Sequence, residues 1–222
     1  MEEKTEGITL KVTPFKENSR IIQIFSKDFG IISLMIKRIS AKKTNLFALS
    51  TPFSHGEFII KKNKGEIFSF LDGSVIDYHL DLRKDLITMQ AASKCLLCIL
   101  KTQYQDRHAP KLFLLLKSYL KAISTVKDPF VLLSSFYLKI LIYEGLLHLS
   151  DKCNICSEKT VSLCNGESLC SYHAMPYGFY FNKNEISTMQ QLACVRNFSS
   201  IKEIFLEKDL IKKIELLFEN LI

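Results

Sequence analysis

Hydrophobic and polar residues alternate along the first third of the chain, from residue 6 to about residue 78. Ile8, Leu10 and Val12 open the pattern, and polar turn residues separate the short apolar runs that follow. Alternation with a period of two is typical of strands that bury one face. The predicted strands begin near residue 6 and then cover residues 20–26, 31–37, 57–62 and 66–71. Five short strands with brief connections favour a small closed barrel.

Apolar residues at spacings of three and four replace this alternation after residue 80. The spacing predicts helices at 81–102, 111–124 and 129–148, and Asp128 before Pro129 is a typical helix start. Residues 130–149 are apolar enough to suggest a membrane span, but Lys139 and Glu144 lie within them. Charges at the centre of a span are costly, so we expect a buried helix and no membrane association.

Residues 151–180 differ from both regions because they are rich in Cys, Gly, Asn and Ser and lack apolar periodicity. Such a segment cannot build a core and needs another source of stability. Helical spacing returns from residue 185 to residue 222. We therefore predict an α+β protein with a barrel at 1–80, a helical domain at 81–150 and 181–222, and a small module at 151–180.

Two pairs of possible metal ligands flank the middle of that module. Cys153 and Cys156 form one pair, and Cys170 and His173 form the second pair, with thirteen residues between the two pairs. Pairs at this spacing are typical of zinc knuckles, and Asn165-Gly166 fits a hairpin tip between them. We predict a structural Zn²⁺ bound by three thiolates and one imidazole. Cys164 is an alternative ligand, although it lacks a partner three residues away.

The other cysteines have a different interpretation. Cys95 and Cys98 lie in an apolar helical run, and Cys194 stands alone, so all three are predicted to be core residues. Seven cysteines, an odd number, in a chain whose charged N-terminus shows no export signal favour thiols over disulfides. We expect a reducing cytoplasm.

Basic residues exceed acidic ones, with 30 Lys and Arg against 23 Asp and Glu, and the net charge of +7 favours a polyanionic partner. A basic loop contains Lys37, Arg38, Lys42 and Lys43 without an acid, which favours phosphate contacts over an ordinary solvated loop. Lys11 and Arg20 could extend the same surface. Two other groups of residues allow both interpretations. A second basic cluster is more typical of a charged hairpin, and three phenylalanines could stack on bases but are more often core residues. These are Lys61, Lys62 and Lys64, and Phe15, Phe29 and Phe47.

No catalytic constellation is visible in the sequence. It has no Gly-rich phosphate loop and no nucleophile elbow, so we expect a protein that is not an enzyme. His55-Gly56-Glu57 matches half of a zinc deaminase motif, but Lys152 precedes Cys153 where that motif has proline.

Several motifs together resemble the RecO family of DNA-repair proteins. The segments that carry the resemblance lie at residues 6–11, 14–19, 21–25, 49–53 and 143–146, the last of which leads into Cys153. The likeness covers most of residues 6–180. It implies an oligonucleotide-binding (OB) type barrel, a helical domain and a zinc knuckle, in which His173 stands where the family usually has a fourth cysteine.

The resemblance also implies a function. Family members bind single- and double-stranded DNA, anneal complementary strands, contact single-strand-binding protein and RecR, and help to load RecA on single-stranded DNA. It implies that Cys153, Cys156, Cys170 and His173 bind zinc. The implied DNA-binding residues are Lys11, Arg20, Lys37, Arg38, Lys42 and Lys43. We expect a bacterial cytoplasmic protein associated with the nucleoid.

Two alternatives remain open on the sequence. One is a zinc-containing adaptor whose barrel binds protein, with the positive charge serving solubility. The other is an RNA-binding barrel protein.

Overall fold

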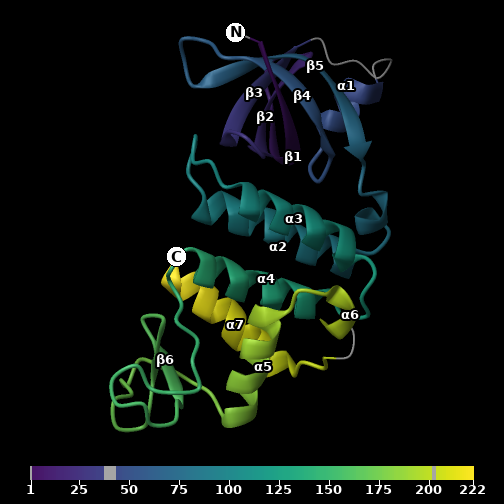
Figure 1. Cartoon of the computed structure of the whole chain (residues 1–222). Coiled ribbons are helices and arrows are strands. Elements are labelled where there is room, and N and C mark those ends of the chain that lie inside the picture. Colours follow the sequence, from purple (N-terminus) through teal and green to yellow (C-terminus); the bar gives the residue numbers. More distant parts are fainter. Residues whose placement is uncertain (1, 38–43, 202–203) are drawn as a thin grey trace. The chain divides into compact units, whose positions relative to one another are not determined.

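A computed structural model describes residues 2–37, 44–201 and 204–222. The chain forms two compact units, Met1–Ser124 and Thr125–Ile222, and each is described by itself. The first unit contains a barrel and two long helices, and the second contains helices and the cysteine-rich module (Figure 1).

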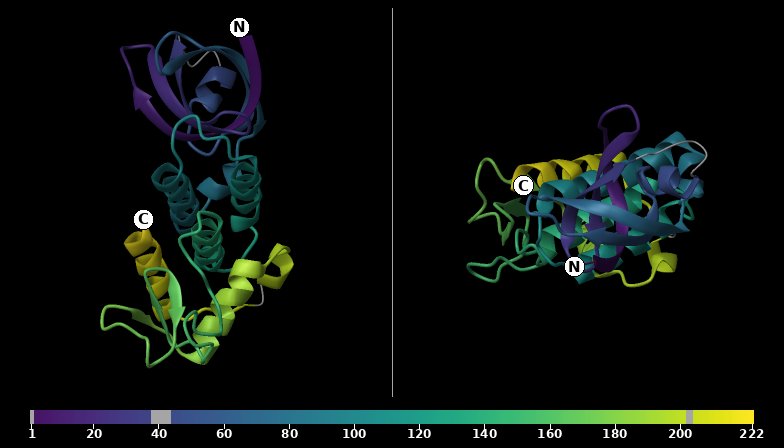
Figure 2. Two further views of the ribbon diagram at one scale, coloured as in Figure 1. Left: turned by 60° about the vertical axis from the view of Figure 1, so that its left-hand side comes forward. Right: turned by 90° about the horizontal axis from the view of Figure 1, so that it is seen from above.

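The predicted closed barrel of five strands is confirmed. Its strands follow the order β1-β2-β3-β5-β4. All neighbouring strands are antiparallel except β3 and β5, which run parallel. The bounds are β1 Glu2–Pro14, β2 Ser19–Ser26, β3 Gly30–Lys37, β4 His55–Lys61 and β5 Ile67–Asp77. The first and last strands extend beyond the predicted ranges. Figure 2 shows the strands wrapping around a common centre.

Alternation along the strands explains the barrel core. Ile22 and Ile24 are fully buried, whereas Gln23 between them faces outward. One element was not predicted: helix α1, Thr44–Leu49, whose Leu49 is buried in the barrel core. A Cβ at Gly73 of β5 would lie 2.9 Å from Leu49 Cδ1, so glycine allows this close approach.

Two helices of the first unit pack against the barrel. The predicted helix at 81–102 is divided into a 3₁₀ turn η1, Leu80–Arg83, and helix α2, Leu86–Thr102. The division occurs because extended Asp85 caps α2 by accepting a hydrogen bond from the Thr88 amide at 2.8 Å. Helix α3, Pro110–Ile123, sets Phe113 edge-on against Phe25 of β2, with ring centroids 6.1 Å apart.

The second unit has α4, Pro129–Tyr143, in contact with α5, Lys183–Cys194, and α7, Lys208–Leu221. A short helix α6, Phe198–Ile201, lies between the last two in sequence. Helix α4 begins at the predicted Asp128 cap but ends earlier than predicted, and Gly145 after it adopts a left-handed conformation with φ of 72°. In the part of the chain that the structure describes, no helix combines the length and apolarity needed to span a membrane.

The cysteine-rich module contains a small sheet in the order β7-β6-β8. Its strands are β6 Ser162–Cys164, β7 Glu167–Leu169 and β8 Phe179–Tyr180. The predicted hairpin tip is confirmed, since Asn165 and Gly166 connect β6 to β7 with φ values of 49° and 81°. One cysteine prediction was wrong: Cys194 is exposed at the end of α5, because its position falls on the side of that helix away from the buried Met189 and Leu192.

Candidate metal centre and nucleic-acid interface

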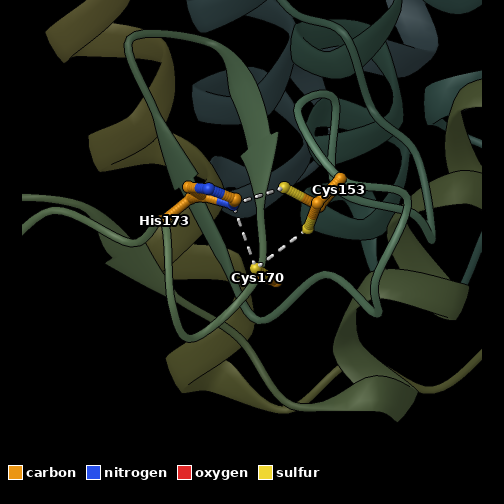
Figure 3. A group of neighbouring side chains, drawn as sticks. Cys153, Cys170 and His173 are labelled. Atoms are coloured by element: carbon orange, nitrogen blue, oxygen red, sulfur yellow. Dashed lines mark hydrogen bonds between the residues drawn. The ribbon is translucent and has the colours of Figure 1, made fainter.

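Two tight turns hold the four predicted metal ligands. In the first turn the Ser157 amide donates to the Cys153 carbonyl at 3.0 Å, and in the second the Ala174 amide donates to the Cys170 carbonyl at 2.8 Å. Each turn directs two ligand side chains inward. Cys153 of the first turn points toward Cys170 and His173 of the second (Figure 3).

The distances between ligand atoms fit a tetrahedral metal site. Cys170 Sγ lies 3.4 Å from His173 Nδ1, Cys153 Sγ lies 3.6 Å from the same nitrogen, and Cys156 Sγ lies 3.6 Å from Cys170 Sγ. All four ligand atoms lie within 4.8 Å of one another. Zinc bond lengths of about 2.3 Å to sulfur and 2.1 Å to nitrogen give tetrahedral edges of about 3.6–3.8 Å. The donor set therefore fits a four-coordinate ion with thiolate preference.

Backbone amides favour thiolates at two of these sulfurs. Burial opposes ionisation of Cys153, but the amides of Cys156 and Ile155 outweigh it and lower the pKa of Cys153 to about 6. Burial likewise opposes ionisation of Cys170, but the His173 amide and other hydrogen-bond donors lower its pKa. A thiolate is the form that binds a metal. Cys164, the alternative ligand, lies buried in β6 and is not in the four-residue group.

The predicted DNA-contact residues fall into three structural groups. Lys11 and Lys37 are exposed on the barrel, and Arg20 is half-buried. Arg38, Lys42 and Lys43 lie outside the described residues.

Strand register places Lys11 and Lys37 on one outer face of the barrel. Lys11 pairs with Gln23 of β2, and Lys37 pairs with Ser19 of the same strand. Residues four apart in a strand share a face and lie about 13 Å apart. Lys11 and Lys37 lie on the two strands that flank β2, so they are further apart than their partners on β2. Their two exposed ammonium groups can contact different phosphates of one strand.

Arg20 has a different environment from the two lysines. It pairs with buried Ile36, so its side chain points toward the barrel interior and α1. Its Nη1 donates to the carbonyl and the hydroxyl oxygens of Ser50, at 3.0 and 3.1 Å. Its guanidinium lies 4.8 Å from the centroid of the Phe47 ring, which is 48% exposed. The result is a fixed cation beside an exposed aromatic face.

The three aromatic candidates are separated by their burial. Phe29 packs against the barrel core, while Phe15 and Phe47 are exposed. The pairing of Phe47 with Arg20 could not be read from the sequence, because the two residues are far apart and no periodicity relates them.

The two polar residues of the deaminase-like motif, His55 and Glu57, form contacts within the barrel. His55 is buried and its Nε2 lies 2.6 Å from Glu6 Oε1, which also accepts a hydrogen bond from Lys117 Nζ at 2.6 Å. Glu57 forms an ion pair with Lys4 at 2.9 Å. His55 and Glu57 thus have separate partners in the barrel.

Comparison with known proteins agrees with this architecture. The family model described as Recombination protein O N terminal matches residues 1–79, and the model described as Recombination protein O C terminal matches residues 83–219. The chain belongs to the RecO family. RecO family membership makes it a DNA-repair protein with an OB-type barrel.

Several RecO proteins of Bacillus are similar to this chain over the same span. A DNA repair protein RecO from Bacillus mycoides (strain KBAB4) is 31% identical over 178 residues, covering 78% of this chain and 71% of the relative. DNA repair protein RecO from Bacillus cereus (strain AH187) is 30% identical with the same coverage. A RecO protein from Bacillus anthracis has the same identity and coverage.

Proposed function

We propose that this protein is an ATP-independent recombination mediator that anneals complementary DNA strands and helps to load RecA onto single-stranded DNA coated by single-strand-binding protein. The observation that carries the proposal is the match to both RecO family models, in order, over nearly the whole chain. The chain's positive charge and its exposed barrel lysines support it.

The proposed mechanism is binding and transfer of DNA without nucleotide hydrolysis. Lys11 and Lys37 contact backbone phosphates, and Phe47, held beside Arg20, offers a face for a base. Holding two strands on a basic surface lowers their repulsion and raises their effective concentration. Annealing is then favoured by proximity alone. The sequence contains no Gly-rich loop of the kind that binds the phosphates of ATP.

We propose that Cys153, Cys156, Cys170 and His173 bind a structural Zn²⁺. Four protein ligands leave no open coordination position, so the ion joins the two turns and does not activate water. The distances among the ligand atoms and the lowered pKa values of Cys153 and Cys170 support the assignment.

The proposed partners are single- and double-stranded DNA, single-strand-binding protein and RecR, with the RecA filament reached indirectly. We propose that the protein acts in the bacterial cytoplasm at the nucleoid. The names of the Bacillus relatives, which are DNA repair proteins, support a partner set from recombinational repair.

Annealing of two labelled complementary oligonucleotides, coated with single-strand-binding protein, tests the proposal without ATP and across a salt series. Wild-type protein should accelerate annealing, and the acceleration should fade as salt rises. The Lys11→Ala/Lys37→Ala variant should anneal more slowly and lower the salt slope of single-strand binding by about 1.4, or about 0.7 for each lost contact. Lys61→Ala/Lys62→Ala removes the same charge from β4 and its turn and is the matched control.

Two outcomes would contradict the proposal. Folded, metal-loaded protein that accelerates annealing at no salt concentration would favour the protein-binding adaptor. A clear preference for RNA over a DNA oligonucleotide of matched sequence would favour an RNA-binding barrel protein.

A further inference from the structure

The second unit contains an open cavity of about 470 Å³ between the start of the cysteine-rich module and α5. Three lysines line it, Lys152, Lys159 and Lys183, together with one acid, Asp151. Buried Thr160 also lines the cavity. The described lining therefore carries a formal excess of positive charge.

Two of the lysines lie directly opposite each other. Lys152 and Lys159 are partners in an antiparallel backbone bridge, and the Thr160 amide donates to the Asp151 carbonyl at 3.0 Å beside it. Opposite residues of an antiparallel pair have side chains on the same face, and like charges in this position repel each other. Folding alone does not favour this arrangement, whereas an anion between the two ammonium groups would.

The third lysine is also in an unfavourable local position. Lys183 is the first residue of α5, directly after the Asn182 cap. The start of a helix carries the positive end of its dipole, which disfavours a cation and favours an anion. An anion in the cavity would offset the charge of Lys183.

Thr160 supplies an observation that is independent of charge. Its side chain is 2% exposed, and its hydroxyl has no hydrogen-bond partner among the described residues. A buried hydroxyl without a partner is unfavourable, and this one belongs to a residue that lines the cavity. Residues that break local rules without compensation are commonly found at functional sites.

We infer that this cavity binds a phosphate group of a DNA backbone. One phosphate would offset the charges of the paired lysines and of Lys183, and its oxygens would accept hydrogen bonds from the three ammonium groups. Lysine acts as a point charge toward phosphate, and no aromatic side chain lines the cavity among the described residues, so the contact is to backbone and not to bases. The inference rests on the proposed function and gives the second unit its own contact with DNA.

The test is the salt dependence of binding to a fluorescent oligo-dT, measured by anisotropy with the full-length protein. Lys152→Ala/Lys159→Ala/Lys183→Ala should reduce the slope of log affinity against log salt by about 0.7, the contribution of one single-strand phosphate contact. The matched control is Lys127→Ala/Lys208→Ala/Lys212→Ala, which removes three exposed lysines of the same unit that do not line the cavity. The control should keep the wild-type slope.

Inorganic phosphate distinguishes a DNA site from a site for a small anion. An unchanged oligo-dT slope in the cavity variant overturns the inference. If the slope is unchanged but inorganic phosphate raises the melting temperature of wild-type protein and not that of the variant, the cavity binds a small anion and the inference is also overturned. Zinc content and circular dichroism show whether the triple variant folds, and Lys159→Ala alone, which should lower the slope by less than about 0.7, replaces it if it does not. Wild-type protein without salt-dependent DNA binding would instead overturn the proposed function.

Discussion

The Arg20 guanidinium lies 4.8 Å from the centroid of the Phe47 ring, while its Nη1 donates to two oxygens of Ser50. These contacts join β2 to α1 and to the residue that follows it. They also keep an exposed aromatic ring beside a cation. Ring and cation together form a surface suited to a nucleobase and its phosphate.

We expect Phe47→Ala to weaken binding to single-stranded DNA by about 1–3 kcal/mol, the usual contribution of one stacked base. Binding to duplex DNA should change less, because duplex bases are already stacked on one another. The salt slope should stay near the wild-type value, since no charge is removed. Anisotropy with oligo-dT and a hairpin duplex measures both, and Tyr104→Ala, which removes a ring that is 74% exposed, is the control. Equal losses for the two DNA forms would contradict base stacking.

Arg20→Lys keeps the positive charge but removes the planar group. Lysine cannot stack on Phe47 as a guanidinium does and cannot reproduce the geometry of the two hydrogen bonds to Ser50. We expect a loss of about 1 kcal/mol in unfolding free energy. In a double-mutant cycle with Phe47→Ala, the sum of the two single losses in DNA-binding free energy should exceed the loss in the double variant. Strictly additive losses would mean that the two residues act independently.

Metal content gives a separate prediction for the cysteine-rich module. We expect about one Zn²⁺ for each chain in wild-type protein, and Cys153→Ser should abolish binding and unfold the module, because its short strands cannot form a core without a metal. Cys164→Ser changes a buried cysteine outside the ligand group and should retain the metal. Elemental analysis and limited proteolysis compare the three proteins. Metal retained in Cys153→Ser, or lost in Cys164→Ser, would assign the ligands differently.

Local sequence patterns predicted the elements whose signals are local. The alternation around Ile22 and Ile24 predicted β2, and the spacing of Cys153, Cys156, Cys170 and His173 brought together the four residues that the structure also groups. The hairpin tip at Asn165 and Gly166 followed from the same kind of short-range rule. In each case a residue's own neighbours determine its geometry.

Contacts between distant residues left no comparable signal. Helix α1 is only six residues long, so it has too few turns to show an apolar stripe. Glu6 and Lys117 are 111 residues apart, and their ion pair depends on how α3 packs against the barrel. The three cavity lysines are individually ordinary surface residues in sequence, and the fold brings them to one cavity.

The barrel contains groups that make its stability depend on pH. Burial lowers the pKa of His55 and of His79, although their acidic neighbours Glu6 and Asp77 act in the opposite direction. Burial alone would raise the pKa of Glu6, but Lys117 and His55 outweigh it and lower this pKa. All three pKa values are depressed, so the folded state binds fewer protons than the unfolded state at acidic pH. The stabilisation is therefore complete above the ordinary histidine pKa of 6.5 and declines as the pH falls through and below that value, with Glu6 adding a further loss below 4.5.

We accordingly expect the unfolding free energy of wild-type protein, measured by urea titration with circular dichroism in excess zinc, to fall between pH 7.5 and pH 5. In His55→Gln/His79→Gln the barrel has no histidine left to protonate, so its unfolding free energy should fall less over the same range, even if the variant is less stable at pH 7.5. His108→Gln/His148→Gln replaces two exposed histidines and is the matched control, which should keep the wild-type dependence. A double barrel variant with the full wild-type dependence would show that the protons bind elsewhere, since only a group whose pKa differs between the two states can change stability with pH.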